Sequence, residues 1–117
     1  MPKGERIKTE DGRANIVGER LRERRRTLKL THAEMIQGIA NVSGGQWEPK
    51  LIDYKRLEAG RRTCIDVEAV CLAKLLNCAA GWLLGDAGAL SPPEDVDRDL
   101  FDPKPEVRRK SASGPGD

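Results

Sequence analysis

The stretch LTHAEMIQGI at residues 30–39, together with YKRLEAGRR at 54–62 and LAKLLNCAAGWLLGD at 72–86, decides the fold of this chain. In the first segment, Thr31 is a good N-cap, and Glu34 three residues later completes a capping box. The second segment ends at Gly60, a residue type that commonly terminates helices, and Gly85 does the same in the third. Three helical segments with their own start or stop signals predict a compact all-α domain.

Five helices are expected from the spacing of apolar residues and from the capping signals. The first runs from Ala14 or Asn15 to Leu28, and its inward stripe combines residue 16 or 17 with residues 21, 25 and 28. The others are expected from residue 31 to the early forties, from 48 or 49 to 60, over 66–76, where Asn77 ends the helix, and over 79–84. The expected inward residues of these helices are Met35, Ile36, Ile39, Leu51, Tyr54, Leu57, Leu72, Ala73, Leu76, Cys78, Trp82 and Leu83.

Length and composition allow one domain with tails in a chain of 117 residues. Aromatic residues make up only 3%, so the core must be built mainly from Leu, Ile, Val and Ala. The net charge is only +2, but residues 13–30 hold seven basic and two acidic side chains, so positive charge concentrates on the first helix. We expect a disordered arm at 1–13, a folded domain at 14–86 and a disordered, acidic, Pro-rich tail at 87–117, in which only Leu100 and Phe101 could make a short contact.

Several function classes are disfavoured by what the sequence lacks. It has no apolar run of about 18 residues and no secretory signal, so we expect no membrane span and a cytoplasmic location with reduced thiols. Cys64, Cys71 and Cys78 have no CxxC pairing and no nearby histidine, so we predict no metal site and no cofactor. With one histidine and no phosphate-binding loop, the chain is not expected to be an enzyme.

The segments GERLRERRRTLKLTHAEMIQGI, YKRLEAGRR and LAKLLNCAAGWLLGD, in this order, resemble the lambda-repressor-like (Cro-type, XRE) family of bacterial and phage regulators. The resemblance covers roughly residues 17–86. It implies a five-helix helix-turn-helix fold whose third helix enters the DNA major groove while the second lies across the backbone. It further implies sequence-specific binding of double-stranded DNA at the nucleoid, as a transcriptional regulator. We expect a dimeric repressor of a near-palindromic operator.

The same resemblance assigns DNA contacts to single residues. Leu51, Ile52 and Arg56 match base-contacting positions, where apolar side chains can pack against thymine methyl groups. Lys55 adds a positive charge to the same helix. His32 matches a position near a DNA phosphate, at a helix N-terminus that offers free amides, although a solvated histidine there needs no role.

The connection between the second and third helices departs from the family. The usual turn has about four residues, whereas NVSGGQWEPKLID carries roughly seven more. Gln46, Trp47 and Lys50 in this insertion are alternative contacts to the groove or the backbone. Trp47 could instead anchor the loop on the domain, the interpretation that we favour slightly.

Four further residues carry structural or backbone roles. Arg25 and Glu58 match positions that form an internal ion pair in the family, so the resemblance implies a bridge from the first helix to the third. Arg61 and Arg62, just past the helix end, are expected to clamp phosphates, which gives affinity and salt dependence without sequence choice.

An alternative function is a protein-interaction module, antitoxin-like or a co-regulator, that uses the Trp47 loop and the Leu51–Ile52 surface. Exposure of these two apolar residues beside basic ones would favour DNA, whereas a larger apolar patch would favour a protein partner. The expected contacts of a homodimer lie on the fifth helix and its flanks, at Ala80, Leu83, Leu84 and Leu90.

Overall fold

The computed structural model describes residues 7–93 and 95–103, and in these residues it is all-helical, as predicted. Five α-helices are followed by one turn of 3-10 helix. They are α1 (Val17–Thr27), α2 (His32–Val42), α3 (Leu51–Ala59), α4 (Asp66–Leu75), α5 (Ala80–Leu83) and η1 (Arg98–Phe101). None of the helices in the described part of the chain is long and apolar enough to cross a membrane.

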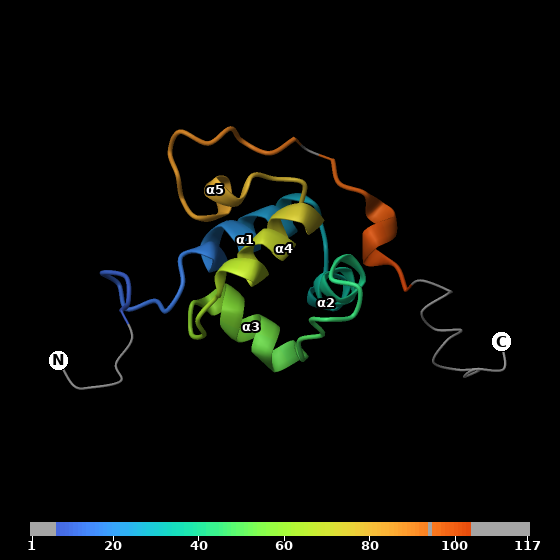
Figure 1. Cartoon of the computed structure of the whole chain (residues 1–117), viewed down its shortest axis with the longest axis horizontal. Coiled ribbons are helices and arrows are strands. Elements are labelled where there is room, and N and C mark those ends of the chain that lie inside the picture. Colours follow the sequence, from blue (N-terminus) through green and yellow to red (C-terminus); the bar gives the residue numbers. More distant parts are fainter. Residues whose placement is uncertain (1–6, 94, 104–117) are drawn as a thin grey trace, which may run out of the picture.

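The helices pack around one core. In Figure 1, α5 lies above α1 and α4, α3 lies below them, and α2 stands beside them with η1 on its outer side. α1 contacts both α3 and α5, and α2 contacts α3, α4 and η1. The largest fully buried side chains are Tyr54, Leu21, Met35, Ile39, Leu57, Leu72, Leu75, Leu76, Leu83 and Val17.

The predicted capping signals around α2, α3 and α4 are confirmed. The Thr31 hydroxyl accepts from the Glu34 amide at 3.0 Å, and the Glu34 carboxylate accepts from the Thr31 amide at 2.8 Å. Gly60 ends α3 with φ 76°, a left-handed conformation that glycine adopts without a Cβ clash. Asn77, with φ 53°, follows α4 in the same region of conformational space.

The beginnings of two helices differ from the prediction. α1 starts at Val17, because Asn15 is used outside the helix, where its Oδ1 accepts from the Gly18 amide at 2.9 Å. α3 starts at Leu51, because Pro49 disfavours helical geometry at residue 48 and residue 50 is extended. The expectation that Leu51 faces inward is wrong: its side chain is 47% exposed, on the first turn beyond the core.

The inward stripe of α1 differs from the prediction at one position, while Val17, Leu21 and Leu28 are buried as expected. Arg24, not Arg25, is the buried arginine, and its Nε and Nη2 donate to the Leu76 carbonyl at 3.2 and 3.0 Å. Because each residue turns a helix by about 100°, Arg24 faces α4 while Arg25 faces α3. The stripe therefore contains Val17, Leu21, Arg24 and Leu28.

Residues 87–117 were expected to be disordered apart from a short contact by Leu100 and Phe101, and this contact is present in the structure. Phe101 of η1 is only 3% exposed. It fits where Gly38 of α2 has no side chain, since a Cβ on Gly38 would come within 2.9 Å of the Phe101 ring. Asn41 donates from Nδ2 to the carbonyls of Leu100 and Asp102. The folded domain thus extends to residue 102, and the rest of the predicted tail, at 104–117, lies outside the described residues.

Candidate nucleic-acid interface

One face of α3 is exposed and carries two kinds of side chain. Leu51 and Ile52 are apolar and are 47% and 61% exposed, while Lys55 and Arg56 are basic and exposed one turn later. Lys50, the N-cap residue, is exposed beside them. In the described part of the chain, none of these three basic side chains forms an ion pair or a side-chain hydrogen bond. The stripe can therefore contact both an anionic backbone and apolar groups.

A basic hollow lies beside this stripe, where α1, α2 and α3 meet. It is lined by Arg22, Arg25, Arg26, His32, Lys55 and Glu58, so four cations share it with one carboxylate. The hollow includes the N-terminal residue of α2, whose free backbone amides also favour anions. Its charge and position suit a phosphate group.

His32 lies at the edge of this hollow and faces the buried part of α3. Its Nε2 is 3.7 Å from Glu58 Oε1, and its ring packs edge-on against Tyr54 with centroids 5.9 Å apart. The side chain is about one-third exposed. It is therefore partly used in packing and partly available to a ligand.

Glu58 is the buried centre of a polar cluster under the hollow. Arg25 Nε donates to Oε2 at 2.7 Å and Nη2 donates to Oε1 at 3.2 Å, so the ion pair implied by the resemblance is present in the structure. The Tyr54 hydroxyl also donates to Glu58. Burial acts to raise the pKa of Glu58, but hydrogen bonds from Arg25 and Tyr54 outweigh it, and the pKa is lowered. Burial and the Glu58 charge raise the pKa of Tyr54, which stays a donor.

The C-terminal end of α3 is covered by the segment that precedes α1. Arg13 Nη2 donates to the Glu58 carbonyl at 2.9 Å, and the Ala14 amide donates to the Gly60 carbonyl at 2.7 Å. Asn15 Nδ2 donates to the Leu57 carbonyl at 3.0 Å. These groups satisfy carbonyls that a helix end leaves free, and the guanidinium complements the negative end of the helix dipole.

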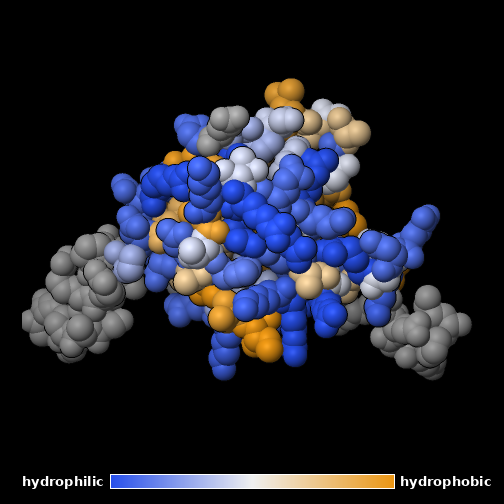
Figure 2. Space-filling view, turned by 180° about the vertical axis from the view of Figure 1, so that it is seen from behind, coloured by the Kyte–Doolittle hydropathy of each residue, from blue (hydrophilic) through white to orange (hydrophobic). Residues whose placement is uncertain are grey.

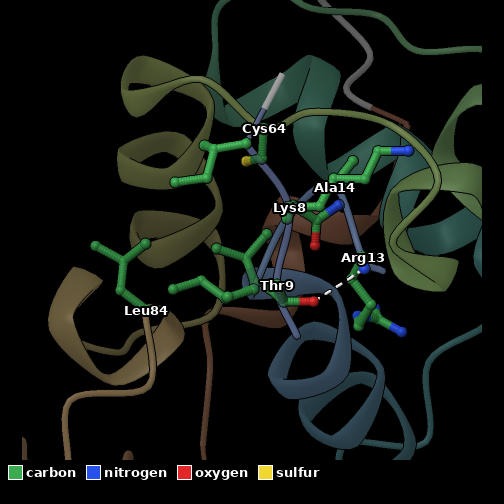
Figure 3. A pocket seen from close by; sticks show the side chains of 10 residues that line it. Lys8, Thr9, Arg13, Ala14, Cys64 and Leu84 are labelled. Carbon is green, nitrogen blue, oxygen red and sulfur yellow. Dashed lines mark hydrogen bonds between the residues drawn. The ribbon is translucent and has the colours of Figure 1, made fainter. Parts of the chain in front are cut away.

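This role of residues 13–15 was not predicted, since Arg13 was assigned to a disordered arm and Ala14 and Asn15 to the start of the first helix. The backbone amide of Arg13 also donates to Thr9 Oγ1 at 2.9 Å (Figure 3). Both residues line a hollow of about 300 Å³, together with Cys64 and Leu84. Gly60 leaves room for this side chain, because a Cβ at that position would lie 2.6 Å from the Arg13 guanidinium. Only the folded structure shows which side chain fills that space. The remaining arm residues, 1–6, lie outside the described residues.

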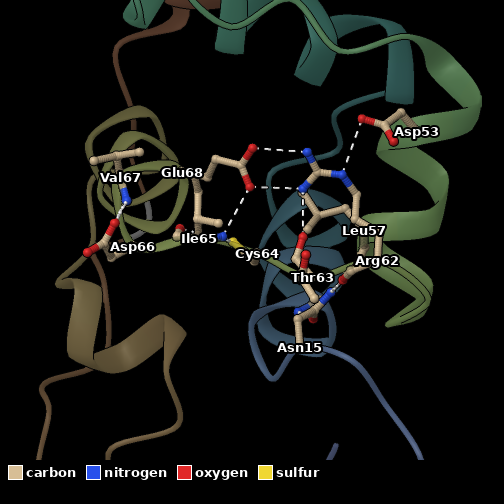
Figure 4. A network of polar contacts seen from close by, with 11 residues as sticks. Asn15, Asp53, Leu57, Arg62, Thr63, Cys64, Ile65, Asp66, Val67 and Glu68 are labelled. Carbon is tan, nitrogen blue, oxygen red and sulfur yellow. Dashed lines mark hydrogen bonds and ion pairs between the residues drawn. The ribbon is translucent and has the colours of Figure 1, made fainter. Parts of the chain in front are cut away.

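Arg62 is placed differently from the predicted phosphate clamp. Its guanidinium donates twice to Glu68, at 2.9 Å each, and once to Asp53 at 3.2 Å (Figure 4). The hydrogen bonds with Glu68 raise the pKa of Arg62 and keep it charged. Since these bonds occupy the fork of the side chain, Arg62 links α3 to α4 rather than facing a ligand. Its neighbour Arg61 is exposed and makes no side-chain bond in the described residues.

The loop between α2 and α3 is folded back on the domain. Ser43 Oγ accepts from the Trp47 amide at 3.0 Å, and Trp47 packs against the core as an anchor. The Arg62 guanidinium lies 5.8 Å from the centre of the Trp47 ring. Gln46 is exposed and lies on the α4 side of the loop, in a groove with Val67. Gln46 and Trp47 therefore face away from the basic hollow, whereas Lys50 lies next to the α3 stripe.

The residues expected to form a dimer contact differ in their solvent exposure. Leu83 is fully buried in the core, so it is wrong as a contact between copies. Leu84 and Leu90 are exposed, and Ala80 is partly buried against the core.

The three cysteines are free and partly exposed, and no group of three or more metal-ligand side chains gathers among residues 7–93 and 95–103.

Seen from behind, the molecule shows hydrophilic side chains across the centre of its surface (Figure 2). Hydrophobic residues come to the surface along the lower edge of this view, where α3 lies in Figure 1.

The chain matches no family model, no curated protein and no solved structure. Any function must therefore be argued from the residues and their geometry.

Proposed function

We propose that the chain is a lambda-repressor-like helix-turn-helix protein that binds double-stranded DNA. In this proposal, the exposed stripe of α3 enters the major groove, while the N-terminus of α2 and Arg61 contact phosphates. The observation that carries the proposal is the stripe itself, which joins two apolar side chains to two basic ones on one exposed face. Leu51 and Ile52 suit thymine methyl groups, and Arg56 suits the acceptor edge of guanine.

The basic hollow supports the same proposal from the backbone side. It lies beside Lys55, on the same side of α3 as the stripe, so one duplex can reach both. A phosphate there would meet the guanidinium of Arg22, the α2 amides and the partly exposed His32. Such contacts fix the position of a duplex and make binding dependent on salt.

The biological role that follows is transcriptional regulation by steric repression. A domain bound in the major groove of an operator excludes polymerase from the same DNA. Two copies on a near-palindrome would place their recognition helices about one helical turn apart. We propose repression as the sign of regulation because occupancy of the operator alone is sufficient for it.

The alternative, a protein-interaction module, would use the same apolar residues. Leu51 and Ile52 would then belong to a wide apolar patch. Their exposed neighbours on the helix are instead Lys50, Lys55 and Arg56. This surrounding favours a polyanion over a protein at α3. The Trp47 loop, which the alternative also invoked, faces the α4 side.

Selection from random-sequence duplex DNA with the full chain tests the proposal. We expect enrichment of a near-palindromic site, with an affinity that falls steeply as salt rises. Arg56→Ala should relax the preference at one base pair, and Arg61→Ala should weaken binding to all sequences alike. Absence of enrichment, together with absence of salt-dependent binding to any duplex, would contradict DNA binding.

A further inference from the structure

The outer face of α4 is apolar in its middle and charged at its ends. Val67 and Val70 are 66% and 46% exposed, although valine is among the residue types most often buried in proteins. Asp66 and Lys74 are exposed four residues before and four residues after Val70. Asp66, Val70 and Lys74 follow the i, i+4, i+8 spacing of a single helix face, and Val67 adjoins Val70 at the i, i+3 spacing; these four residues form the α4 stripe.

A hollow lies on each side of this stripe. On one side, a groove of about 510 Å³ runs between α4 and the Trp47 loop, with Val42 and Cys71 in its wall. On the other side, Val70 and Lys74 border a second hollow, together with Leu90 and Pro92. α4 therefore presents a ridge between two grooves, which is the shape that packs against another helix of the same kind.

The Trp47 groove is lined by one carboxylate, Glu68, and by Lys74 at its edge. Glu68 is the acidic residue in its lining, and its charge is matched by Arg62 through two hydrogen bonds of 2.9 Å. Burial acts to raise the pKa of Glu68, but the bonds from Arg62 lower it overall, so the pair stays ionised and mutually satisfied. The groove can then receive an apolar ridge without leaving a carboxylate unpaired.

We propose that this face docks a second copy of the chain, with the two α4 helices antiparallel about a twofold axis near Val70. In that arrangement, Asp66 and Lys74 each lie about 6 Å along the helix from the axis, in opposite directions. Asp66 of each copy then faces Lys74 of the other, and Val67 of each copy enters the Trp47 groove of the other. The helix dipoles also run in opposite directions, which is favourable.

Self-complementarity is the reason to choose a second copy over another partner. A ridge and a groove that adjoin on one surface fit each other once a twofold axis is applied, and so do charges of opposite sign at equal distances from the axis. A parallel pairing would place Asp66 against Asp66. A duplex DNA is disfavoured here because the stripe carries one acidic and one basic residue. The inference does not rest on DNA binding by α3, since the two faces use different residues.

Sedimentation velocity of the full chain without DNA, across micromolar to millimolar concentrations, tests the proposal. We expect a monomer–dimer equilibrium. Val70→Asp should raise the dimer dissociation constant by about a hundredfold, because it buries an unpaired charge at the axis. Since Val70 is exposed in the monomer, circular dichroism and unfolding curves should match those of the parent protein. The matched control is Leu84→Asp, on the exposed apolar residue beside α5, which should leave the dimer unchanged.

A charge reversal gives a readout that a structural defect would not imitate. Asp66→Lys should weaken the dimer about tenfold by placing like charges opposite each other. Adding Lys74→Asp to the same chain should restore the affinity to within about threefold. Failure of this rescue, with a folded double variant, would overturn the antiparallel pairing.

Cross-linking locates the axis independently. Cys71 is one residue from Val70, so in a chain that keeps only this cysteine, a short bis-maleimide should join two copies. Chains that keep only Cys64 or only Cys78 should give little product, since Cys64 precedes α4 and Cys78 follows it, each beyond an end of the helix and away from the axis at Val70. A chain that is monomeric at all concentrations would overturn the proposal, and so would a dimer that Leu84→Asp abolishes while Val70→Asp leaves it intact.

Discussion

At its C-terminal end, α3 is held by buried polar contacts to residues from several parts of the chain, whereas the exposed stripe of the same helix carries Lys55 and Arg56, which have no polar side-chain partner in the described residues. Arg13, Asn15 and Arg25 bind the last turn of the helix or its carboxylate. Leu51 and Ile52 of the stripe are exposed as well. Stability and recognition are thus assigned to different side chains of one short helix, so substitutions in the buried contacts and on the stripe should have different consequences.

The largest effect is expected from removing the carboxylate at the fixed end. Glu58→Ala should lower the free energy of unfolding by about 3–5 kcal/mol, because Arg25 would be left charged and unpaired and Tyr54 would lose its acceptor. Urea unfolding monitored by circular dichroism measures this change. Lys55→Ala, one turn earlier and exposed, should change stability by less than about 0.5 kcal/mol. A Glu58→Ala loss below about 1 kcal/mol would refute the view that this end is locked.

The cover over the helix end should come next in size. Asn15→Ala removes hydrogen bonds to the carbonyls of Leu57 and Arg62 and the acceptor for the Gly18 amide. We expect a loss of about 1–3 kcal/mol in unfolding free energy, since buried carbonyls would lose their donors. Gln46→Ala, an exposed amide with no such bonds, serves as the matched control in the same urea titration. Equal stabilities of the two variants would show that the cover contributes nothing.

On the exposed stripe of α3, the effect should fall on binding and leave stability unchanged. Arg56→Ala should reduce discrimination at one base pair by about 1–3 kcal/mol, while its unfolding curve overlays that of the parent. Fluorescence anisotropy with the selected duplex and its single-base variants measures both the loss and its position. Uniform weakening on all duplexes would instead assign Arg56 to the phosphate backbone.

Arg61 and Arg62 are adjacent in sequence, but we expect Arg62 to stabilise the fold and Arg61 to contact DNA phosphates. Arg62→Ala should lower stability by about 1 kcal/mol, because Glu68 would lose its bidentate partner. Arg61→Ala should leave stability unchanged and reduce the slope of log affinity against log salt by about one. Paired unfolding and salt-titration data on both variants check this division. The reverse pattern would return the clamp role to Arg62.

The smallest effect should come from acidification. The pKa of Glu58 is lowered in the folded state, so the folded chain binds fewer protons than the unfolded chain in acid. Its contribution to stability is complete above its usual pKa of about 4.5 and is lost as the pH falls through the folded value. The stability difference between the parent and Glu58→Gln should therefore shrink below that pH. Glu68 titrates in both proteins, so it cancels, and a pH-independent difference would contradict this linkage.

Local signals in the sequence were sufficient for much of the fold. Thr31 with Glu34, and Gly60 at the end of α3, depend only on neighbours along the chain, and both are confirmed. The all-α class follows from the same signals. Contacts that depend on helix phase were harder, because a shift of one residue on α1 exchanges Arg24 and Arg25.

Apart from the Arg25–Glu58 ion pair, which the family resemblance implied, the contacts between distant segments were not predicted from the sequence. Phe101 packs at Gly38, and Arg13 covers the carbonyl of Glu58, across gaps of tens of residues. Each distant partner lies in a segment whose composition is typical of disorder, and composition does not reveal which single side chain finds a complementary space. The same limit hid the bonds of Arg62 to Glu68, since a pair of arginines after a helix is equally suited to a phosphate or to a carboxylate.

The most direct test of the central claim, that the exposed stripe of α3 reads DNA, is an amide NMR titration of the full chain with a mixed-sequence duplex at low salt. We predict that the shifts concentrate at residues 31–34 and 50–56 and at Arg61, and that raising the salt reverses them. Absence of shifts, or shifts confined to α4 and the Trp47 loop, would contradict the claim.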